Sequence, residues 1–145
     1  MSIEYNSVTP PMDDYVALFQ STGWTFRRPV TPDVLALSLE KSWFCVFAYD
    51  GQRLVGSGRV VTDGWLHAII YDVMVLPAYQ RRGIGREIMR RLLQQCLDAQ
   101  IGTIQLFCAA GKQTFYERLG FVVRPADKPG MQYQGGAIPA AGGER

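Results

Sequence analysis

The sequence predicts one α/β domain in which an antiparallel meander of strands leads into a β-α-β crossover. Two turn signals, Asp50-Gly51 and Asp63-Gly64, separate three β-rich runs and predict the meander. The crossover is indicated by an apolar run, a glycine-containing turn, an amphipathic stretch and a second β-rich run, in that order. The 145 residues suffice for one domain with a real core and are too few for two.

The amino-terminal third is predicted to hold one short strand and two helices. Residues 3–6 form the strand, and residues 11–20 form a helix with Pro11 at its start. Thr31 is the expected N-cap of the second helix, with Pro32 at its first position. The apolar face of this helix is expected to contain Val34, Leu35, Leu37, Leu39 and Trp43.

The meander is predicted to consist of strands over residues 43–49, 54–61 and 66–76. Gly56 and Gly58 in the middle strand indicate a bulge or the close approach of another group. Strict alternation in the third strand assigns its residues to two faces. His67, Ile69, Tyr71, Val73 and Val75 fall on one face, and Asp72 and Met74 on the other.

An unusual concentration of arginine marks the start of the crossover helix. Free N–H groups at a helix N-terminus carry partial positive charge, which disfavours arginine there unless an anion binds. The simplest such anion is a pyrophosphate. A third glycine and a Gly-Lys-Ser/Thr sequence are both missing, which excludes a dinucleotide fingerprint and a P-loop. The turn is Gln80-Arg81-Arg82-Gly83-Ile84-Gly85, the further arginines are Arg86, Arg90 and Arg91, and the apolar helix positions are Ile84, Ile88, Met89, Leu92, Leu93, Cys96 and Leu97.

The remaining elements follow the helix. Residues 103–108 are expected to form a strand, and a short helix is expected to end at Gly120. Residues 121–123 are predicted to be the next strand. Residues 135–145 are rich in Gly, Ala and Pro and are predicted to be a disordered tail, which places the domain at residues 1–134.

Two motifs together make the sequence resemble the GNAT superfamily of N-acetyltransferases. The first is the 80–85 turn that opens a helix, and the second is Phe115-Tyr116-Glu117-Arg118-Leu119-Gly120-Phe121. They lie 30 residues apart, counted from Gly85 to Phe115, with one helix and one strand between them. The resemblance covers roughly residues 66–121. It implies the GNAT acyltransferase fold, with a mixed and mostly antiparallel sheet, about four helices and a splayed parallel pair of strands that admits acetyl-coenzyme A.

The resemblance also implies how the cofactor is held. Val73 N–H would contact the acetyl oxygen, and Val75 would pair with the pantetheine arm. An asparagine that often contacts pantetheine in the family is replaced here by Ala109, so Gly111 and Lys112 would supply backbone donors instead. The full set of predicted cofactor-binding residues is Val73, Met74, Val75, Gln80, Arg81, Arg82, Gly83, Ile84, Gly85, Arg86 and Lys112.

Two catalytic residues are predicted, Tyr116 and Asp72. Tyr116 is the candidate general acid for the departing thiolate, because a phenol is protonated at neutral pH; the alternative is a core tyrosine. Ile69 stands where some family members carry a base, so the base stays open between Asp72, His67 and a water chain.

The acceptor site is predicted at the loop between the first two helices, with Trp24, Phe26, Arg27 and Arg28 as substrate-binding residues. A packed loop with surface arginines is the alternative. We expect direct attack by a small primary amine in a ternary complex. Acetylation of protein lysines or N-termini, a non-catalytic coenzyme A-binding module and a basic nucleic-acid binder remain alternatives, and the net charge of +2 disfavours the last.

Composition supplies the remaining expectations. Three cysteines in apolar segments and one histidine indicate free thiols in a reducing compartment and no metal site. We expect a cytoplasmic enzyme without signal peptide or membrane span, which contacts no nucleic acid or membrane; its oligomeric state, with a homodimer as one option, stays open.

Overall fold

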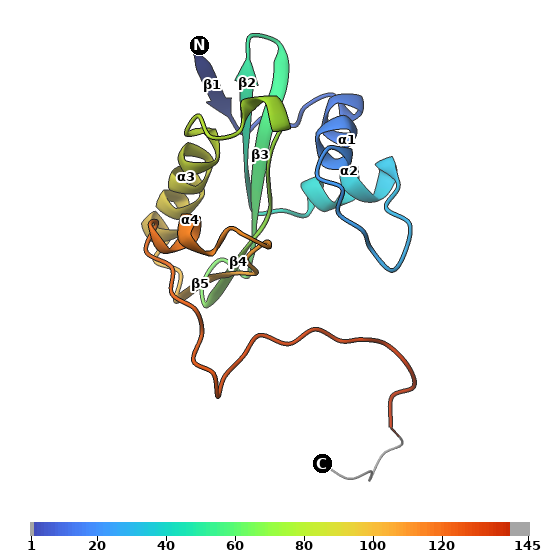
Figure 1. Ribbon diagram of the computed structural model, residues 1–145, viewed down its shortest axis with the longest axis vertical. Helices are drawn as coiled ribbons and strands as arrows, with labels where there is room; N and C mark the ends of the chain where they lie inside the picture. The colour runs from blue at the N-terminus through green and yellow to red at the C-terminus, as the bar shows by residue number, and fades with distance from the viewer. Residues whose placement is uncertain (1, 140–145) are drawn as a thin grey trace.

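The computed structural model describes residues 2–139 and has one sheet with helices on both faces (Figure 1). The strands follow the order β1-β2-β3-β4-β5, all antiparallel except for the parallel pair β4–β5. This confirms the predicted mixed sheet with four α-helices. The elements are β1 Ile3–Asn6, α1 Met12–Gln20, α2 Pro32–Glu40, β2 Phe44–Asp50, β3 Arg53–Thr62, β4 His67–Val75, the 3₁₀ turn η1 Pro77–Tyr79, α3 Ile84–Asp98, β5 Thr103–Leu106 and α4 Gln113–Glu117.

Helix α3 covers one face of the sheet, and α1 and α2 cover the other (Figure 1). The cluster under α3 contains Ile88, Met89 and Leu92, each with no exposed area. Fully burying an aliphatic side chain contributes about 1.5–3 kcal/mol, so this face is a main source of the fold's stability. Leu97 was expected on the same face but is 61% exposed, because it lies at the far side of the last helical turn.

The two glycines of β3 let α3 approach the sheet closely, as predicted. A Cβ at Gly58 would lie only 2.8 Å from Ile88 Cγ2 and from Leu92 Cδ1. A Cβ at Gly56 would lie 3.0 Å from Ile88 Cδ1. Larger residues at either position would push the helix away from the strand.

Strand β4 contains a bulge at Asp72, which makes the predicted division of its faces wrong. Ser57 pairs with Met74 and Arg59 with Tyr71, so one β3 residue opposes two residues of β4. Asp72 adopts the left-handed conformation, with φ of +54°. The extra residue reverses the alternation along the strand. Ala68 and Ile70 before the bulge, and Val73 and Val75 after it, all pack into the α3 cluster, whereas Met74 packs beneath α1 and α2.

The parallel pair is short, and the two strands separate after it. β5 pairs with β4 only from His67 to Ile70. The predicted strand over 103–108 therefore ends at Leu106, because beyond Ile70 the bulged strand offers it no partner. Within residues 2–139, the β5-facing side of residues 71–75 has no neighbouring strand.

Two further expectations are corrected. Residues 121–123 form no strand; Val122 is 85% exposed and Val123 66%, because the chain leaves the sheet after α4 (Figure 1). On α2, Val34 and Leu37 are exposed, and only Leu35 and Leu39 are buried, because one side of the helix contacts the sheet.

The predicted start of α2 and the predicted helix end at Gly120 are both confirmed, and hydrogen bonds donated by backbone N–H groups explain them. Thr31 Oγ1 accepts from Val34 N–H, which caps α2 as expected. Gly120 has φ of +98° and Phe121 N–H donates to the Tyr116 carbonyl, the pattern of a Schellman end. Residues 135–139 have no regular secondary structure, and residues 140–145 of the predicted tail lie outside the described residues.

Candidate active site

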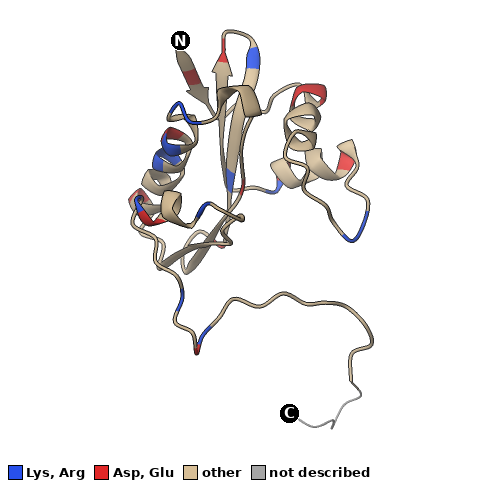
Figure 2. Ribbon diagram, in the orientation of Figure 1, with Lys and Arg blue, Asp and Glu red and all other residues tan. Residues whose placement is uncertain are grey.

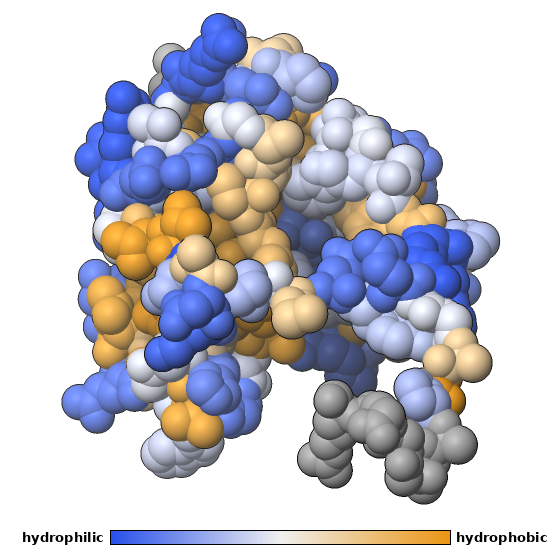
Figure 3. Space-filling view, turned by 60° about the horizontal axis from the view of Figure 1, so that its bottom comes forward, coloured by the Kyte–Doolittle hydropathy of each residue, from blue (hydrophilic) through white to orange (hydrophobic). Residues whose placement is uncertain are grey.

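A wedge opens where β4 and β5 separate, beside the N-terminus of α3 and next to α4. Figure 3 shows the surface hollowed on this side of the molecule, between two flanking lobes. We call the open β4 edge at residues 71–75, together with the first turn of α3 and α4, the wedge. It brings together the two sequence motifs.

The first turn of α3 offers unsatisfied backbone donors to the wedge. The first helical hydrogen bond runs from Glu87 N–H to the Gly83 carbonyl at 3.1 Å. The N–H groups of Ile84, Gly85 and Arg86 therefore have no acceptor within the helix, and no side chain caps this end. Donors that converge at a helix N-terminus suit a phosphate group.

Gly83 makes this helix end possible. It is the N-cap residue of α3 and has φ of +83°, a conformation that only glycine adopts without strain. A Cβ built at Gly83 would meet no atom within 4 Å, so the space beside it is open. Arg81 also has positive φ, at +62°, and the turn is held in a sharply curved form.

The arginines near this helix form two groups in the structure, whereas along the sequence they form one cluster. Glu87 binds Arg90 at 2.7 Å and Arg91 at 3.1 Å, and Arg91 also lies over the Tyr5 ring at 4.7 Å. Those two arginines are thus engaged along the side of the helix. Arg81, Arg82 and Arg86 are exposed at its start, as Figure 2 shows in blue.

Two side chains attach the turn to the sheet. Gln80 Nε2 donates to the Val75 carbonyl at 3.0 Å and so joins the turn to the end of β4. Tyr79 Oη donates to Asp50 Oδ2 at 2.6 Å, and its ring lies 5.5 Å from both the Arg53 and the Arg82 guanidinium. Tyr79 escaped the sequence reasoning, although an aromatic residue directly before the motif was a visible signal.

Gly85 lies inside the wedge. A Cβ there would be 3.6 Å from Phe115 Cζ and 3.7 Å from Val75 Cγ2, which are ordinary contacts. The first turn of α3, the end of β4 and α4 therefore meet at one point. A Cβ at position 85 would therefore not clash with the rest of the protein, so packing within the protein does not by itself require glycine there.

Tyr116 is half-buried on α4. Its ring packs edge-to-face on Phe115 at 5.0 Å and on Phe121 at 6.0 Å. Burial, and secondarily the charge that Cys108 would carry, raise the pKa of Tyr116 above its ordinary value. The raised pKa keeps the Tyr116 phenol protonated at neutral pH.

Asp72 is bound by an arginine that sequence reasoning missed. Arg59 Nε lies 2.8 Å from Asp72 Oδ2, and both side chains are largely buried. The Arg59 guanidinium therefore occupies Oδ2 of the Asp72 carboxylate. The signal in the sequence was Arg59 itself, the one charge inside the otherwise apolar run of residues 54–61.

His67 lies at the opposite end of β4. Its Nδ1 is 2.6 Å from Thr103 Oγ1, at the start of the parallel pair. Six residues separate it from Val73, roughly 20 Å at the usual rise of a strand. Proton transfer between His67 and the wedge would need a long chain of waters.

Lys112 has no free backbone donor. Its N–H donates to the Ala109 carbonyl at 3.1 Å, which closes the turn before α4. This is at odds with the backbone contact expected of Lys112. The Lys112 side chain is exposed.

Two aromatic residues of the acceptor loop contact Phe19, although Trp24 stays 38% and Phe26 55% exposed. Phe26 stacks on Phe19 at 5.7 Å and Trp24 meets the same ring edge-to-face at 6.1 Å. Phe19 is buried in the cluster beneath α1 and α2. Arg27 and Arg28 are exposed, and the Arg27 guanidinium lies against Gly135.

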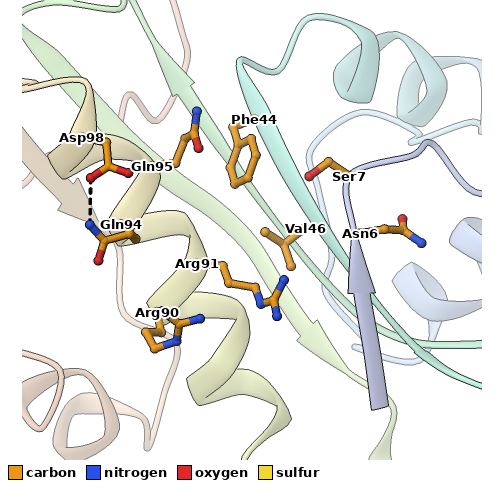
Figure 4. A pocket seen from close by; sticks show the side chains of 9 residues that line it. All are labelled: Asn6, Ser7, Phe44, Val46, Arg90, Arg91, Gln94, Gln95 and Asp98. Carbon is orange, nitrogen blue, oxygen red and sulfur yellow. Dashed lines mark hydrogen bonds between the residues drawn. The ribbon is translucent and has the colours of Figure 1, made fainter. Parts of the chain in front are cut away.

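A groove of about 290 Å³ lies along α3, away from the wedge (Figure 4). Its walls are the polar side of α3 and the ends of β1 and β2, and its floor includes Phe44 and Val46. Arg90 and Arg91 line it, but none of the predicted cofactor-binding residues does. We therefore place the chemistry in the wedge and not in this groove.

Within residues 2–139, no three His, Cys, Asp or Glu side chains gather in a way that could hold a metal ion. No helix in the same range has the length and apolar character to cross a membrane. The three cysteines are free thiols.

Comparison with known proteins identifies the relatives of this chain. The acetyltransferase (GNAT) family profile matches residues 13–121. The histone acetyltransferase TAP1 of Glycine max is 33% identical over 129 residues, which cover 81% of this chain and 54% of TAP1. The uncharacterized N-acetyltransferase ycf52 of Porphyra purpurea is 34% identical over 116 residues, covering 79% and 66% of the two chains.

A solved structure agrees with these relatives. A GNAT-family acetyltransferase from Streptococcus pneumoniae superimposes with a TM-score of 0.77 at 29% identity, covering 92% of this chain and 97% of the other. The chain spans about half to two-thirds of the length of the curated relatives named above.

Proposed function

Because the chain belongs to the GNAT family of acetyltransferases, we propose that it transfers the acetyl group of acetyl-coenzyme A to a primary amine of a small molecule. The family makes it an acyltransferase. The observation that carries the proposal is the meeting, in one wedge, of an uncapped helix N-terminus, an unpaired strand edge and a protonated tyrosine.

The residues of the wedge fit coenzyme A chemically. The N–H groups of Ile84, Gly85 and Arg86 would hold the pyrophosphate, with Arg81 and Arg82 adding charge. Residues 73–75 would pair through their backbone with the amide-containing pantetheine arm. Gln80, which binds the Val75 carbonyl, would fix the end of that strand.

Acetyl-coenzyme A supplies a thioester whose carbonyl carbon the neutral amine attacks; a C–N bond forms, the C–S bond breaks, and the amine loses a proton. Val73 N–H would stabilise the developing negative charge on the carbonyl oxygen. Tyr116 would donate a proton, or a hydrogen bond, to the sulfur as it leaves. Both groups belong to the walls of the same wedge.

The base is proposed to be water. Asp72 is engaged by Arg59, and His67 is remote, so neither is well placed to receive the amine proton. A water chain leading from the wedge would serve a substrate that reaches the site partly deprotonated. A proton-accepting role for Asp72 stays the competing assignment and is tested in the next section.

The small amine is the favoured acceptor. The loop of Trp24 and Phe26 packs on Phe19, so it forms a compact wall, with Arg27 and Arg28 available to a carboxylate of the substrate. A protein acceptor is the second candidate, because the Glycine max relative is named a histone acetyltransferase. A homodimer and a cytoplasmic location remain proposals, the latter supported by the free cysteines.

One assay tests the proposal. Thiol release from acetyl-coenzyme A is measured across a panel of small amines, amino acids, lysine peptides and histones. We expect turnover with at least one small amine and little with peptides or histones. Turnover confined to peptides or histones would transfer the proposal to protein substrates, and coenzyme A binding without any turnover would indicate a non-catalytic module.

A further inference from the structure

We propose that Arg59 is a positioning residue whose ion pair with Asp72 holds the bulge in β4 and thereby keeps the wedge open. The inference deepens the proposed acetyltransferase function and rests on it. It concerns a side chain of β3 that lies outside the wedge itself and acts through its neighbour.

Arg59 is fixed by contacts on three sides. Its Nε binds Asp72 Oδ2 at 2.8 Å, its Nη1 donates to Ser42 Oγ at 3.2 Å, and its guanidinium lies 5.5 Å from the Tyr71 ring centre. Only 16% of the Arg59 side chain and 18% of the Asp72 side chain is exposed. Such a shielded pair retains more of its attraction than a surface pair, and the planar guanidinium gives it a defined direction.

The pair explains an otherwise unfavourable backbone conformation. Asp72 has φ of +54°, a conformation that glycine adopts readily, aspartate occasionally and most other residues only under strain. Without the bulge, alternation would direct the Asp72 side chain toward α3, where Ile88 and Leu92 are fully buried. A carboxylate there would lack a partner, so the left-handed conformation and the contact with Arg59 stabilise each other.

The bulge is what separates β4 from β5. Pairing with β5 stops at Ile70, two residues before Asp72. An extra residue bends its strand and increases the local twist, which directs the edge at Val73 and Val75 away from β5. If Asp72 returned to an extended conformation, that edge would be free to pair with the chain after Leu106 and the wedge would narrow.

The other groups around the pair do not replace it. Tyr15 is buried beside it, and burial first, then the Asp72 charge, raise the pKa of the Tyr15 phenol. Tyr15 therefore stays neutral and supplies no counter-charge. Among the described residues, Arg59 is the one cation paired with Asp72.

Glycine and alanine at position 72 separate a conformational role from a proton-accepting one. Both Asp72→Gly and Asp72→Ala remove the carboxylate, but only glycine adopts positive φ readily. We expect Asp72→Gly to exceed Asp72→Ala about tenfold in coenzyme A affinity and in kcat/KM, a factor that lies within the range of the left-handed penalty for alanine. Equal loss in the two variants would overturn the proposal and favour Asp72 as the base.

The role of Arg59 is tested by combining a substitution of Arg59 with Asp72→Gly or with Asp72→Ala. Arg59→Met keeps the length of the side chain and removes its charge, and we expect it to lower coenzyme A affinity at least tenfold. Adding Asp72→Gly should restore most of that loss, whereas adding Asp72→Ala should not. Arg59→Met with unchanged coenzyme A affinity would overturn the proposal.

Amide hydrogen exchange supplies a readout that needs no activity. In Arg59→Met we expect the exchange rates of residues 71–75 to change, while those of α3 beyond its first turn stay as in the wild type. Unchanged rates in residues 71–75 would show that the pair does not hold the bulge. If exchange and coenzyme A binding respond as expected but no amine is acetylated, the proposed activity fails and the positioning role stands.

Discussion

Replacing Gly83 with aspartate or alanine separates the backbone requirement at the start of α3 from its electrostatics. Gly83 has φ of +83° and open space where a Cβ would lie. Both substitutions therefore carry a conformational penalty, about 1–2 kcal/mol for alanine and less for aspartate, which adopts the left-handed region more readily. The alanine variant should lose that amount of stability, and coenzyme A affinity should fall by no more than about tenfold.

Aspartate adds two effects of opposite sign. As an N-cap it can accept from the unsatisfied donors of the first turn, which contributes roughly 0.5–1 kcal/mol to stability relative to alanine. The same carboxylate repels a pyrophosphate: one pair of unit charges about 6 Å apart, at an effective dielectric constant near 20, interacts by roughly 3 kcal/mol. We therefore expect Gly83→Asp to unfold at a higher temperature than Gly83→Ala but to bind coenzyme A more than about 100-fold more weakly.

Calorimetric titration measures how the variants rank in coenzyme A affinity, and thermal unfolding measures how they rank in stability. Gly64→Asp is the matched control, because Gly64 also has positive φ, at +88°, and open space beside it, but lies in the turn between β3 and β4. It should lose stability without losing coenzyme A affinity. If Gly83→Asp binds coenzyme A as tightly as Gly83→Ala does, no phosphate lies at this helix end and the placement of the cofactor is wrong.

Three further expectations concern the tyrosine, the tail and the acceptor loop. Tyr116→Phe should lower kcat about 10²- to 10⁴-fold with coenzyme A affinity retained, if proton donation to sulfur limits turnover; near-normal turnover in steady-state kinetics would reduce Tyr116 to a packing residue. Because the Tyr116 pKa is raised above its ordinary value near 10, the phenol stays protonated at neutral pH, and any loss of wild-type kcat caused by its ionisation should begin only above about pH 10 and be missing from the phenylalanine variant. Deleting residues 135–145 should shift the melting temperature by less than about 2 °C, since residues 135–139 have no regular structure, although Gly135 lies against Arg27 and the Gly136 carbonyl accepts from Tyr133 Oη; a larger drop, or a change of oligomeric state in light scattering, would show that the tail is structural. Trp24→Ala should raise KM for the amine more than KM for acetyl-coenzyme A, whereas an equal rise in both would mean that Trp24 only packs on Phe19.

The elements along the chain could be predicted from the sequence because their signals are local. Thr31 and Pro32 fixed the start of α2, and Gly120 fixed the end of the helical turn after α4, since each acts through hydrogen bonds or dihedral angles of its own neighbours. Gly83 at the start of α3 is of the same kind. The family resemblance carried by the two motifs implied the separation of β4 and β5, whose pairing ends at Ile70.

The internal geometry of the wedge depended on tertiary contacts. Alternation assigns the faces of β4 correctly only while its register is uninterrupted, and the left-handed Asp72 that reverses them is held by Arg59, thirteen residues earlier on another strand. The aromatic loop is likewise fixed by Phe19, which no pattern within residues 24–28 reveals.

The sequence by itself determined the four α-helices, the five strands and their order, and the expectation of an anion at the start of α3, but it wrongly added a strand at residues 121–123. Only the tertiary structure decided where β4 bulges, that β5 stops at Leu106, and that Arg90 and Arg91 are bound by Glu87 along the side of α3. The physical reason is the range of the interactions. Capping and periodicity act over a few residues, whereas strand register and buried ion pairs are settled between segments that meet only in the folded chain.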